Sequence, residues 1–220
     1  MIDQSFSAVF ASALHGAPTV VVRHGEEPTT LPVDLWRRPA DQHDRTLVEL
    51  CVGPTIDVGC GPGRMTEALA LAGHLALGID VVDAAVAMTR ERGVAAVRRD
   101  VFDRVPGEGR WATALLADGN IGIGGDPVAL LRRVRRLLAP GGRVVVEVGG
   151  PGVRLAQGWA SLETAGRRSR PFRWATLGVD DLPGTAAAAG LGVHAVHRLG
   201  DRYAAVLAGA CPGPSSGSSW

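Results

Sequence analysis

A glycine-rich loop at residues 57–63 is the part of this sequence best suited to chemistry. It reads Asp-Val-Gly-Cys-Gly-Pro-Gly, follows a short apolar run and precedes a helical pattern. Glycines at such a turn let the backbone fold tightly and bring its amides close to a ligand at the helix N-terminus. The glycines are spaced as GxGxG, and Arg64 stands where a dinucleotide fingerprint needs its third glycine. This spacing disfavours a nicotinamide-dependent oxidoreductase, and the absence of a following Gly-Lys-Ser/Thr disfavours a P-loop.

Two acids stand where a bound nucleoside would need them. Asp80 ends the second predicted strand, where a carboxylate can accept hydrogen bonds from both ribose hydroxyls. Asp100 ends the third predicted strand, where it can accept a hydrogen bond from an adenine amino group. Together with the loop, these acids indicate a ligand that contains adenosine but no phosphate.

The elements that must position these residues follow from the hydrophobic pattern. From Pro54 onward, short apolar runs alternate with longer helical patterns, which is typical of a doubly wound α/β fold with a mostly parallel sheet and helices on both faces. We expect strands at residues 55–58, 74–79, 95–99, 113–117, 143–148 and 172–177. We expect helices at residues 64–72, 82–92, 127–138 and 181–189. The final runs 193–199 and 203–207 flank a short turn and predict an antiparallel hairpin that closes the sheet.

Several strand-end features together resemble the class I S-adenosylmethionine-dependent methyltransferases over roughly residues 45–208. They are the stretch 57–63, Asp80, Asp100, the sequence Asp118-Gly119-Asn120 and the turn 138–142. The resemblance implies a Rossmann-like, seven-stranded sheet whose last strand runs antiparallel to the others. It also implies S-adenosyl-L-methionine as cofactor and S-adenosyl-L-homocysteine as product.

The same resemblance implies a set of cofactor-binding residues. They are Asp57, Gly59, Cys60, Gly61, Gly63, Asp80, Val81, Asp100, Val101 and Asp118. In this pattern the loop wraps the methionyl part, Asp80 holds the ribose, and Val81 packs on the adenine. Asp100 and the Val101 backbone read the adenine edge, and Asp118 lies toward the sulfonium and methionyl end.

Methyl transfer from a sulfonium is a direct displacement, so the protein can accelerate it largely by holding the reacting atoms in line in a water-poor site. A hydroxyl acceptor would also need a base to remove its proton. Asp118 and Asn120 are the candidate catalytic residues, because ligands of open α/β sheets bind at the carboxyl ends of the strands. The N-terminal histidines, His15, His24 and His43, are either candidate bases or merely solvated side chains.

Several segments of the chain are expected in addition to the core of the methyltransferase-like domain. We expect residues 1–44 to form an N-terminal cap, 45–210 the methyltransferase domain, 150–180 a substrate-facing insert and 211–220 a disordered tail. The sequence between Gly149 and Phe172 is rich in Pro, Gly and Arg and predicts loose structure. Its arginines at 167–173 stand beside aromatic residues and are either acceptor-binding groups, a nucleic-acid contact or a solvated run.

The composition limits the remaining classes. The chain has 220 residues, 46% hydrophobic and 20% charged, with a formal net charge of +1, so no global field favours nucleic acid or an anionic membrane. Its 3 cysteines form no CxxC pair and predict neither disulfides nor a metal site. No basic signal segment or long apolar run is present, so we expect a cytoplasmic protein, either monomeric or homodimeric.

The sequence therefore predicts a methyltransferase that acts on a small-molecule acceptor, with a compound of secondary metabolism as one candidate. Residues 118–122 do not match the Asp/Asn/Ser-Pro-Pro-aromatic motif of enzymes that methylate nucleic-acid amino groups, which argues against such a substrate. Two alternatives stay open. One is a protein of the same fold that binds the cofactor for a non-methylating reaction, and the other is an RNA or protein methyltransferase.

Overall fold

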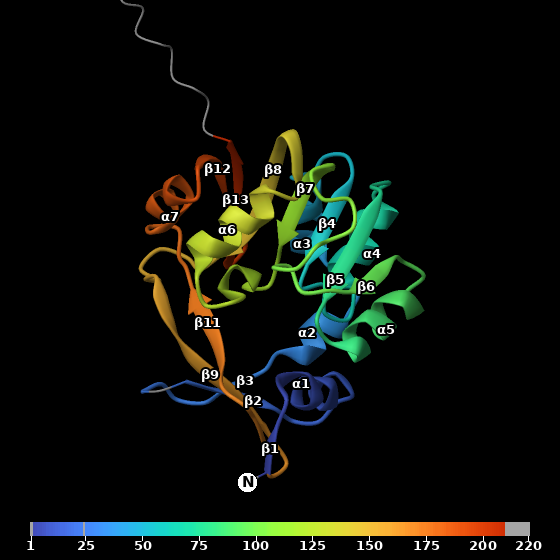
Figure 1. The fold of residues 1–220 in the computed structure, drawn as a ribbon, viewed down its shortest axis with the longest axis vertical. Helices are drawn as coiled ribbons and strands as arrows, with labels where there is room; N and C mark the ends of the chain where they lie inside the picture. Colours follow the sequence, from blue (N-terminus) through green and yellow to red (C-terminus); the bar gives the residue numbers. More distant parts are fainter. Residues whose placement is uncertain (1, 24, 210–220) are drawn as a thin grey trace, which may run out of the picture.

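The computed structural model describes residues 2–23 and 25–209, and its larger part is an α/β domain (Figure 1). Within those ranges, a seven-stranded sheet has the order β12-β13-β8-β7-β4-β5-β6. Its strands are β4 (Thr55–Val58), β5 (Ala76–Asp80), β6 (Ala96–Arg98), β7 (Trp111–Leu116), β8 (Leu138–Val148), β12 (Leu191–Leu199) and β13 (Arg202–Gly209). Strands β4 to β8 are parallel, and β13 is antiparallel to both of its neighbours. The predicted sheet and its closing hairpin are confirmed.

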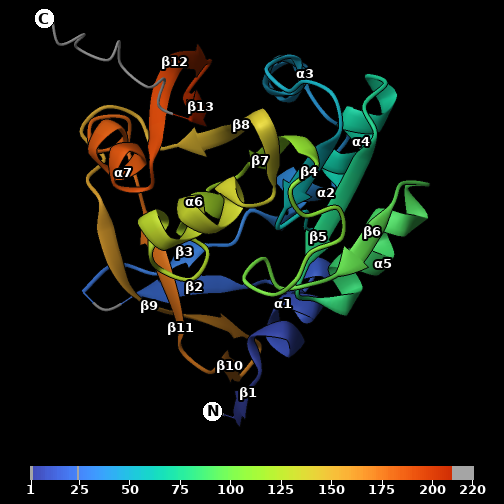
Figure 2. The same cartoon turned by 45° about the horizontal axis from the view of Figure 1, so that its top comes forward.

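Helices cover both faces of this sheet, and the alternation of apolar side chains along its strands explains why. On β7, Ala114 and Leu116 join the core with Leu130 and Leu131 of one helix layer. Leu115, between them, points to the other face. One layer holds α3 (Gln42–Glu49), α4 (Arg64–Leu71) and α5 (Asp83–Glu91), and the other holds α6 (Pro127–Arg135) and α7 (Leu182–Ala188) (Figure 2).

A second sheet faces the carboxyl ends of the parallel strands, and we call it the cover sheet. In the described part of the chain it has six strands: β1 (Ile2–Gln4), β2 (Val20–Arg23), β3 (Thr29–Thr30), β9 (Ala156–Thr164), β10 (Arg167–Ser169) and β11 (Phe172–Thr176). The prediction of loose structure between Gly149 and Phe172 was therefore wrong. Strand β9 lacks a clear alternating pattern, and its partner β2 lies far away in the sequence, so only the tertiary pairing reveals it.

Two short connections hold the cover sheet on the larger domain. Helices α1 (Phe6–Leu14) and α2 (Val33–Arg37) contribute Leu14 and Val33 to a small core with Ala85 of α5. On the other side, Ile123 forms an isolated bridge with Trp174 of β11. The backbones approach so closely here that a Cβ at Gly122 would lie 2.2 Å from the Ala175 carbonyl oxygen.

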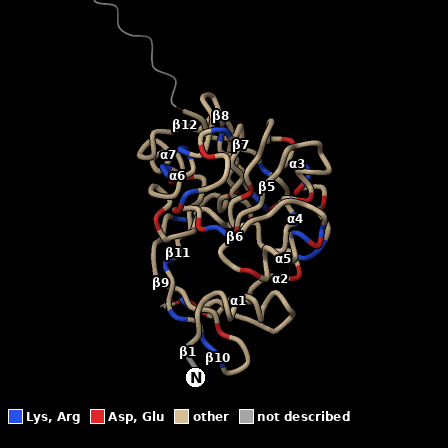
Figure 3. Tube along the Cα trace, turned by 45° about the vertical axis from the view of Figure 1, so that its right-hand side comes forward, with Lys and Arg blue, Asp and Glu red and all other residues tan. Residues whose placement is uncertain are grey.

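Some element boundaries differ from those predicted. Helix α6 ends at Arg135 rather than at 138, and β8 begins at Leu138, so the turn 138–142 belongs to a strand. The predicted tail 211–220 lies outside the described residues. Acidic and basic residues are interspersed along the trace of both parts (Figure 3). In the part that the structure describes, no helix is long and apolar enough to cross a membrane.

Candidate functional site

The glycine loop lies where β4 passes into α4, as the sequence predicted. The N–H groups of Gly59 and Cys60 both donate to the Ile79 carbonyl oxygen, at 2.8 and 3.0 Å, and this ties the loop to the end of β5. Gly59 has a φ of +74°, and a Cβ there would lie 2.8 Å from Nδ2 of Asn120. A side chain at position 59 would therefore be both strained and obstructed.

Asp80 connects the same loop to the next strand end. Its Oδ2 accepts a hydrogen bond from the Gly61 N–H at 3.0 Å, and its Oδ1 accepts one from the Val82 N–H at 2.9 Å. Burial raises the pKa of this carboxyl, and the backbone hydrogen bonds act against that rise. Asp80 is half-buried and borders the cavity, so its remaining lone pairs can accept hydrogen bonds from a ligand.

Asp57 is the most deeply buried acid beside the loop, with an exposed fraction of 1%. Its Oδ2 accepts a hydrogen bond from the Thr66 hydroxyl at 2.7 Å. The pKa of Asp57 is raised to about 7, and burial is the main cause. The Thr66 hydrogen bond acts against this rise, and the nearby charges of Asp118 and Asp80 add to it. Its contacts fasten the start of α4 to β4.

The predicted adenine-binding residues line one end of the cavity. Val81 is apolar yet 39% exposed at the end of β5, where it offers an apolar contact surface. Asp100 is exposed, and its Oδ1 accepts a hydrogen bond from the Phe102 N–H at 2.9 Å. Val101 is buried beside it. These residues lie at neighbouring strand ends, as the sequence predicted, because β5 pairs with β6.

Asp118 and Asn120 lie at the end of β7, and both are occupied by protein contacts. Nη2 of Arg64 donates to both carboxylate oxygens of Asp118, at 2.6 Å each. Nδ2 of Asn120 donates to the carbonyl oxygens of Val58 and Gly59, both at 2.9 Å. Asp118 has a φ of +53°, which is uncommon for a residue other than glycine. Their catalytic role stays a prediction, and these contacts favour positioning over proton transfer.

Behind Asp118 is a network of buried charges that the sequence did not reveal. Arg64 has a side-chain exposure of 3% and contacts both Asp118 and Asp44. Arg202 donates to Asp44 at 2.6 Å and to both oxygens of Glu147, at 2.6 and 2.7 Å. Burial would raise the pKa of Asp44, but hydrogen bonds from Arg202 and Arg64 hold it well below its usual range. Charged partners therefore fix the backbone around Asp118.

Asp44 also belongs to the start of α3. Its side chain accepts a hydrogen bond from the Asp41 N–H at 3.0 Å, while Asp41 accepts one from the Asp44 N–H at 2.8 Å. This capping box is the signal that could have identified Asp44 in the sequence, since an acid three residues after another marks a helix N-terminus. Its ion pairs with Arg64 and Arg202 depend on distant segments and carry no such signal.

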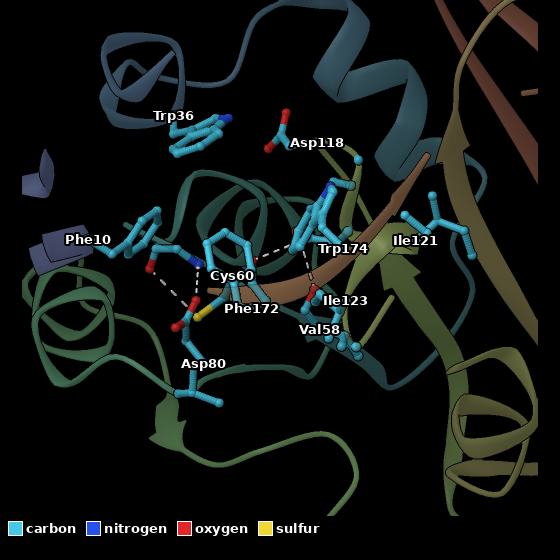
Figure 4. A pocket seen from close by; sticks show the side chains of 18 of the residues that line it. Phe10, Trp36, Val58, Cys60, Asp80, Asp118, Ile121, Ile123, Phe172 and Trp174 are labelled. Atoms are coloured by element: carbon cyan, nitrogen blue, oxygen red, sulfur yellow. Dashed lines mark hydrogen bonds between the residues drawn. The ribbon is translucent and has the colours of Figure 1, made fainter. Parts of the chain in front are cut away.

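These features enclose a cavity of about 830 Å³ between the strand ends and the cover sheet. That size is within the range of small-molecule sites. Its two sides differ. The strand ends contribute glycine backbone and acids, and we call this side the strand-end floor. The other side is largely apolar and receives aromatic residues from α1, α2 and β11: Phe6, Phe10, Trp36, Phe172 and Trp174. Figure 4 shows residues of both sides around one space.

Some predicted residues lie elsewhere. Gly63 does not border the cavity; it precedes α4 at a φ of +87°, and a Cβ there would lie 2.7 Å from Thr89. His15 ends α1, where its Nδ1 lies 2.7 Å from the Ala11 carbonyl oxygen, and His43 packs against Gly200. His24 lies outside the described residues. Among the described residues, no group of three or more His, Cys, Asp or Glu could hold a metal ion.

A family model described as a methyltransferase domain matches residues 56–142. These residues span the glycine loop, Asp80, Asp100 and Asp118, and lie within the seven-stranded sheet whose order is given above. Residues 56–142 therefore resemble a methyltransferase domain. The matched segment holds the strand-end floor, whereas the strands of the cover sheet lie outside it.

Curated proteins similar to this chain include two kinds of methyltransferase. Trans-aconitate 2-methyltransferase of Paracidovorax citrulli is 33% identical over 125 residues, which are 52% of this chain and 48% of that protein. Ubiquinone biosynthesis O-methyltransferase of Pseudomonas paraeruginosa is 35% identical over 98 residues, 40% of this chain and 41% of that protein. The chain thus spans about half or less of the length of these relatives.

Solved structures share the methyltransferase fold over more of the chain. A SAM-dependent methyltransferase from Bacteroides fragilis, in complex with S-adenosyl-L-homocysteine, has a TM-score of 0.77 and 22% identity over 94% of each chain. The 1,6-didemethyltoxoflavin-N1-methyltransferase of Burkholderia thailandensis has a TM-score of 0.60 and 18% identity, covering 92% of this chain and 87% of that one. At these identities the similarity establishes a common fold.

Proposed function

We propose that this protein binds S-adenosyl-L-methionine on the strand-end floor and transfers its methyl group to a small-molecule acceptor. The observation that carries the proposal is the pairing of the Gly59–Gly61 loop with the Asp80 carboxylate at one cavity wall. A Cβ built at Gly61 would meet no atom within 4 Å, so a ligand can lie directly against this backbone. The methyltransferase family model that covers the same residues supports the proposal.

The groups on the floor fit the parts of this cofactor in order. In the proposal, Asp80 accepts hydrogen bonds from the ribose, Val81 packs on the adenine and Asp100 accepts from the adenine amino group. The methionyl end then lies toward Asp118. The ion network there holds four carboxylates (Asp41, Asp44, Asp118 and Glu147) for three guanidiniums (Arg38, Arg64 and Arg202), an excess of negative charge that favours the positive ammonium and sulfonium groups.

The bound cofactor would supply an activated methyl group, so the chain's own task is to align the acceptor and exclude water. Asn120 serves this alignment by fixing the carbonyl groups of Val58 and Gly59, which shapes the floor. Asp118 is held by Arg64, and a proton taken up by its carboxylate would weaken that ion pair. We therefore propose positioning roles for both residues.

We propose the same domain organisation that the sequence predicts. Residues 1–44 and 150–180 act as a cap and a substrate-facing insert that together complete the cavity over the domain of residues 45–210. Cys51 and Cys60 are both buried free thiols, in keeping with a reduced, cytoplasmic setting. Within the Arg167 to Arg173 segment, Arg168 pairs with Glu163 at 3.3 Å and Arg173 lies over the Trp159 ring, so these side chains already have protein partners.

Calorimetric titration tests the cofactor assignment. We expect S-adenosyl-L-homocysteine to bind the full-length protein and NADH not to bind. The Asp80→Ala change should weaken S-adenosyl-L-homocysteine binding by about 30-fold or more, because charge-assisted hydrogen bonds to the ribose are lost. The matched control is Asp83→Ala, which removes a 77% exposed carboxylate three residues away. Equal affinity in the Asp80→Ala variant, or binding of NADH alone, would contradict the proposal.

A further inference from the structure

Five aromatic side chains form a continuous layer on the cover side of the cavity. Phe6 stacks on Phe10 with a centroid separation of 5.3 Å, and it meets Phe172 edge-on at 4.8 Å. Phe172 meets Trp174 edge-on at 6.2 Å, and Phe10 lies 6.0 Å from Trp36. All five rings are only half-buried and border the cavity. They leave ring surface available to a ligand.

The layer belongs to the acceptor side because the polar strand ends account for the cofactor. Every acid that borders the cavity comes from the floor: Asp57, Asp80, Asp100 and Asp118. The cover strands add the aliphatic side chains of Val21 and Leu162, which pair across β2 and β9. An acceptor on this side therefore meets flat rings and aliphatic groups, which favour a planar apolar body.

One positive charge accompanies this apolar surface. In the sheet register Arg23 pairs with Ala160, and Ala160 pairs with Phe172, so the three side chains share one face. Phe172 lies in the cavity on this face (Figure 4). The Arg23 side chain is 29% exposed, and its ion-pair partner, Glu26 at 3.1 Å, is 55% exposed. Such a surface pair is weak, so the guanidinium can exchange Glu26 for an anionic ligand group.

We propose that the acceptor is a planar aromatic acid, with its ring system against Phe172 and Trp174 and its carboxylate at Arg23. This inference rests on the proposed function and adds the substrate class. In the transfer, a lone pair of the acceptor forms the new bond to the methyl carbon. The carbon–sulfur bond breaks with its electron pair left on sulfur, and any proton on the acceptor atom passes to solvent.

This substrate class differs from that named for the trans-aconitate relative. An open-chain tricarboxylate needs several cations close together, whereas the cover strands contribute two arginines to the described cavity lining. Of these, Arg173 has its guanidinium over the Trp159 ring, 5.3 Å from the centroid. A single carboxylate on an aromatic ring matches Arg23, the one remaining guanidinium that the cover strands contribute to the described lining.

The test compares three compounds: naphthalene-2-carboxylate as the probe, its neutral carboxamide, and trans-aconitate. Each is titrated into the full-length protein saturated with S-adenosyl-L-homocysteine. We expect the naphthoate to bind more tightly than trans-aconitate. Trp174→Ala should weaken naphthoate binding about 10-fold. Arg23→Gln should weaken naphthoate binding about 10-fold and should change the affinity for the carboxamide by less than about 2-fold. The control is Arg168→Gln, which changes an arginine of the same sheet that pairs with Glu163.

S-adenosyl-L-homocysteine affinity is measured for every variant and separates the possible failures. If the wild-type protein does not bind it, the proposed function fails. If it binds but the naphthoate does not, or if the naphthoate binds equally well to Trp174→Ala, the substrate class is overturned. Displacement of S-adenosyl-L-homocysteine by the naphthoate would also overturn it. Should Trp174→Ala lose S-adenosyl-L-homocysteine binding, Phe172→Ala replaces it in the same comparison.

Discussion

The strand-end floor and the cover sheet enclose the same cavity, but they are built in opposite ways. The floor consists of short strand–loop–helix units, in which Asp80 fastens a loop only nineteen residues away along the chain. The cover sheet pairs β2 with β9 and β1 with β10, segments that precede and follow the parallel strands in the sequence. Chemistry that resides in one local unit can be recognised from the sequence, whereas a surface assembled from distant segments cannot.

The two regions also differ in how charge is used. Beneath the floor, Arg64 and Asp44 are almost fully buried and hold each other in place. In the cover sheet, the pair of Arg168 and Glu163 has side-chain exposures of 42% and 28%, and apolar rings dominate the cavity face. We infer that ion pairs stabilise the floor and that the cover sheet depends on apolar contacts.

The largest expected effect comes from breaking the buried network. Arg64→Met should lower the free energy of unfolding by about 3–5 kcal/mol, because it removes the buried cation between Asp44 and Asp118 and leaves Asp118 with Arg202 at 3.7 Å as its remaining charged partner. The matched change in the cover sheet, Arg168→Met, should cost less than about 1 kcal/mol. Urea unfolding of both variants measures the difference. Equal losses of unfolding free energy in the two variants would show that ion pairs stabilise the two regions equally, and this would contradict the account.

A smaller effect concerns pH. The pKa of Asp57 is raised from 3.8 to about 7, so its contribution to stability is complete below pH 4 and is lost as pH rises through 7. Asp57→Asn cannot ionise, so its free energy of unfolding relative to the wild type should rise by roughly 3 kcal/mol as the pH goes from 5 to 8. In the cover sheet, Thr164→Val removes a neutral hydrogen bond to the Pro18 carbonyl oxygen and should cost the same at both pH values. A stability difference between Asp57→Asn and wild type that stays constant with pH would contradict this account.

The sequence predicted the floor well because its signals are local. The strand at 55–58, the loop, Asp80 and the closing hairpin were all placed correctly. Gly63 was assigned to the cofactor, but it serves the start of α4, since glycine spacing alone does not show which backbone faces a ligand. The roles of Arg64 and Glu147 depend on partners such as Asp44 and Arg202 in other elements.

The cover sheet was not predicted, for a physical reason that its residues make plain. Phe6 and Phe10 are spaced as one face of a helix, and Phe172 and Trp174 as one face of a strand. Each pattern alone describes only an amphipathic segment. Their meeting in one aromatic layer depends on the pairing of β1, β2, β10 and β11 around β9, which no local pattern specifies.

The most direct test is a crystal structure of the full-length protein with S-adenosyl-L-homocysteine. The account predicts the ribose hydroxyls on Asp80, the adenine beside Val81 and the sulfur directed toward the space lined by Phe172 and Trp174. That space itself should hold no part of the nucleoside. An adenine stacked within the aromatic layer, or a ribose away from Asp80, would contradict the division of the cavity into a cofactor side and an acceptor side.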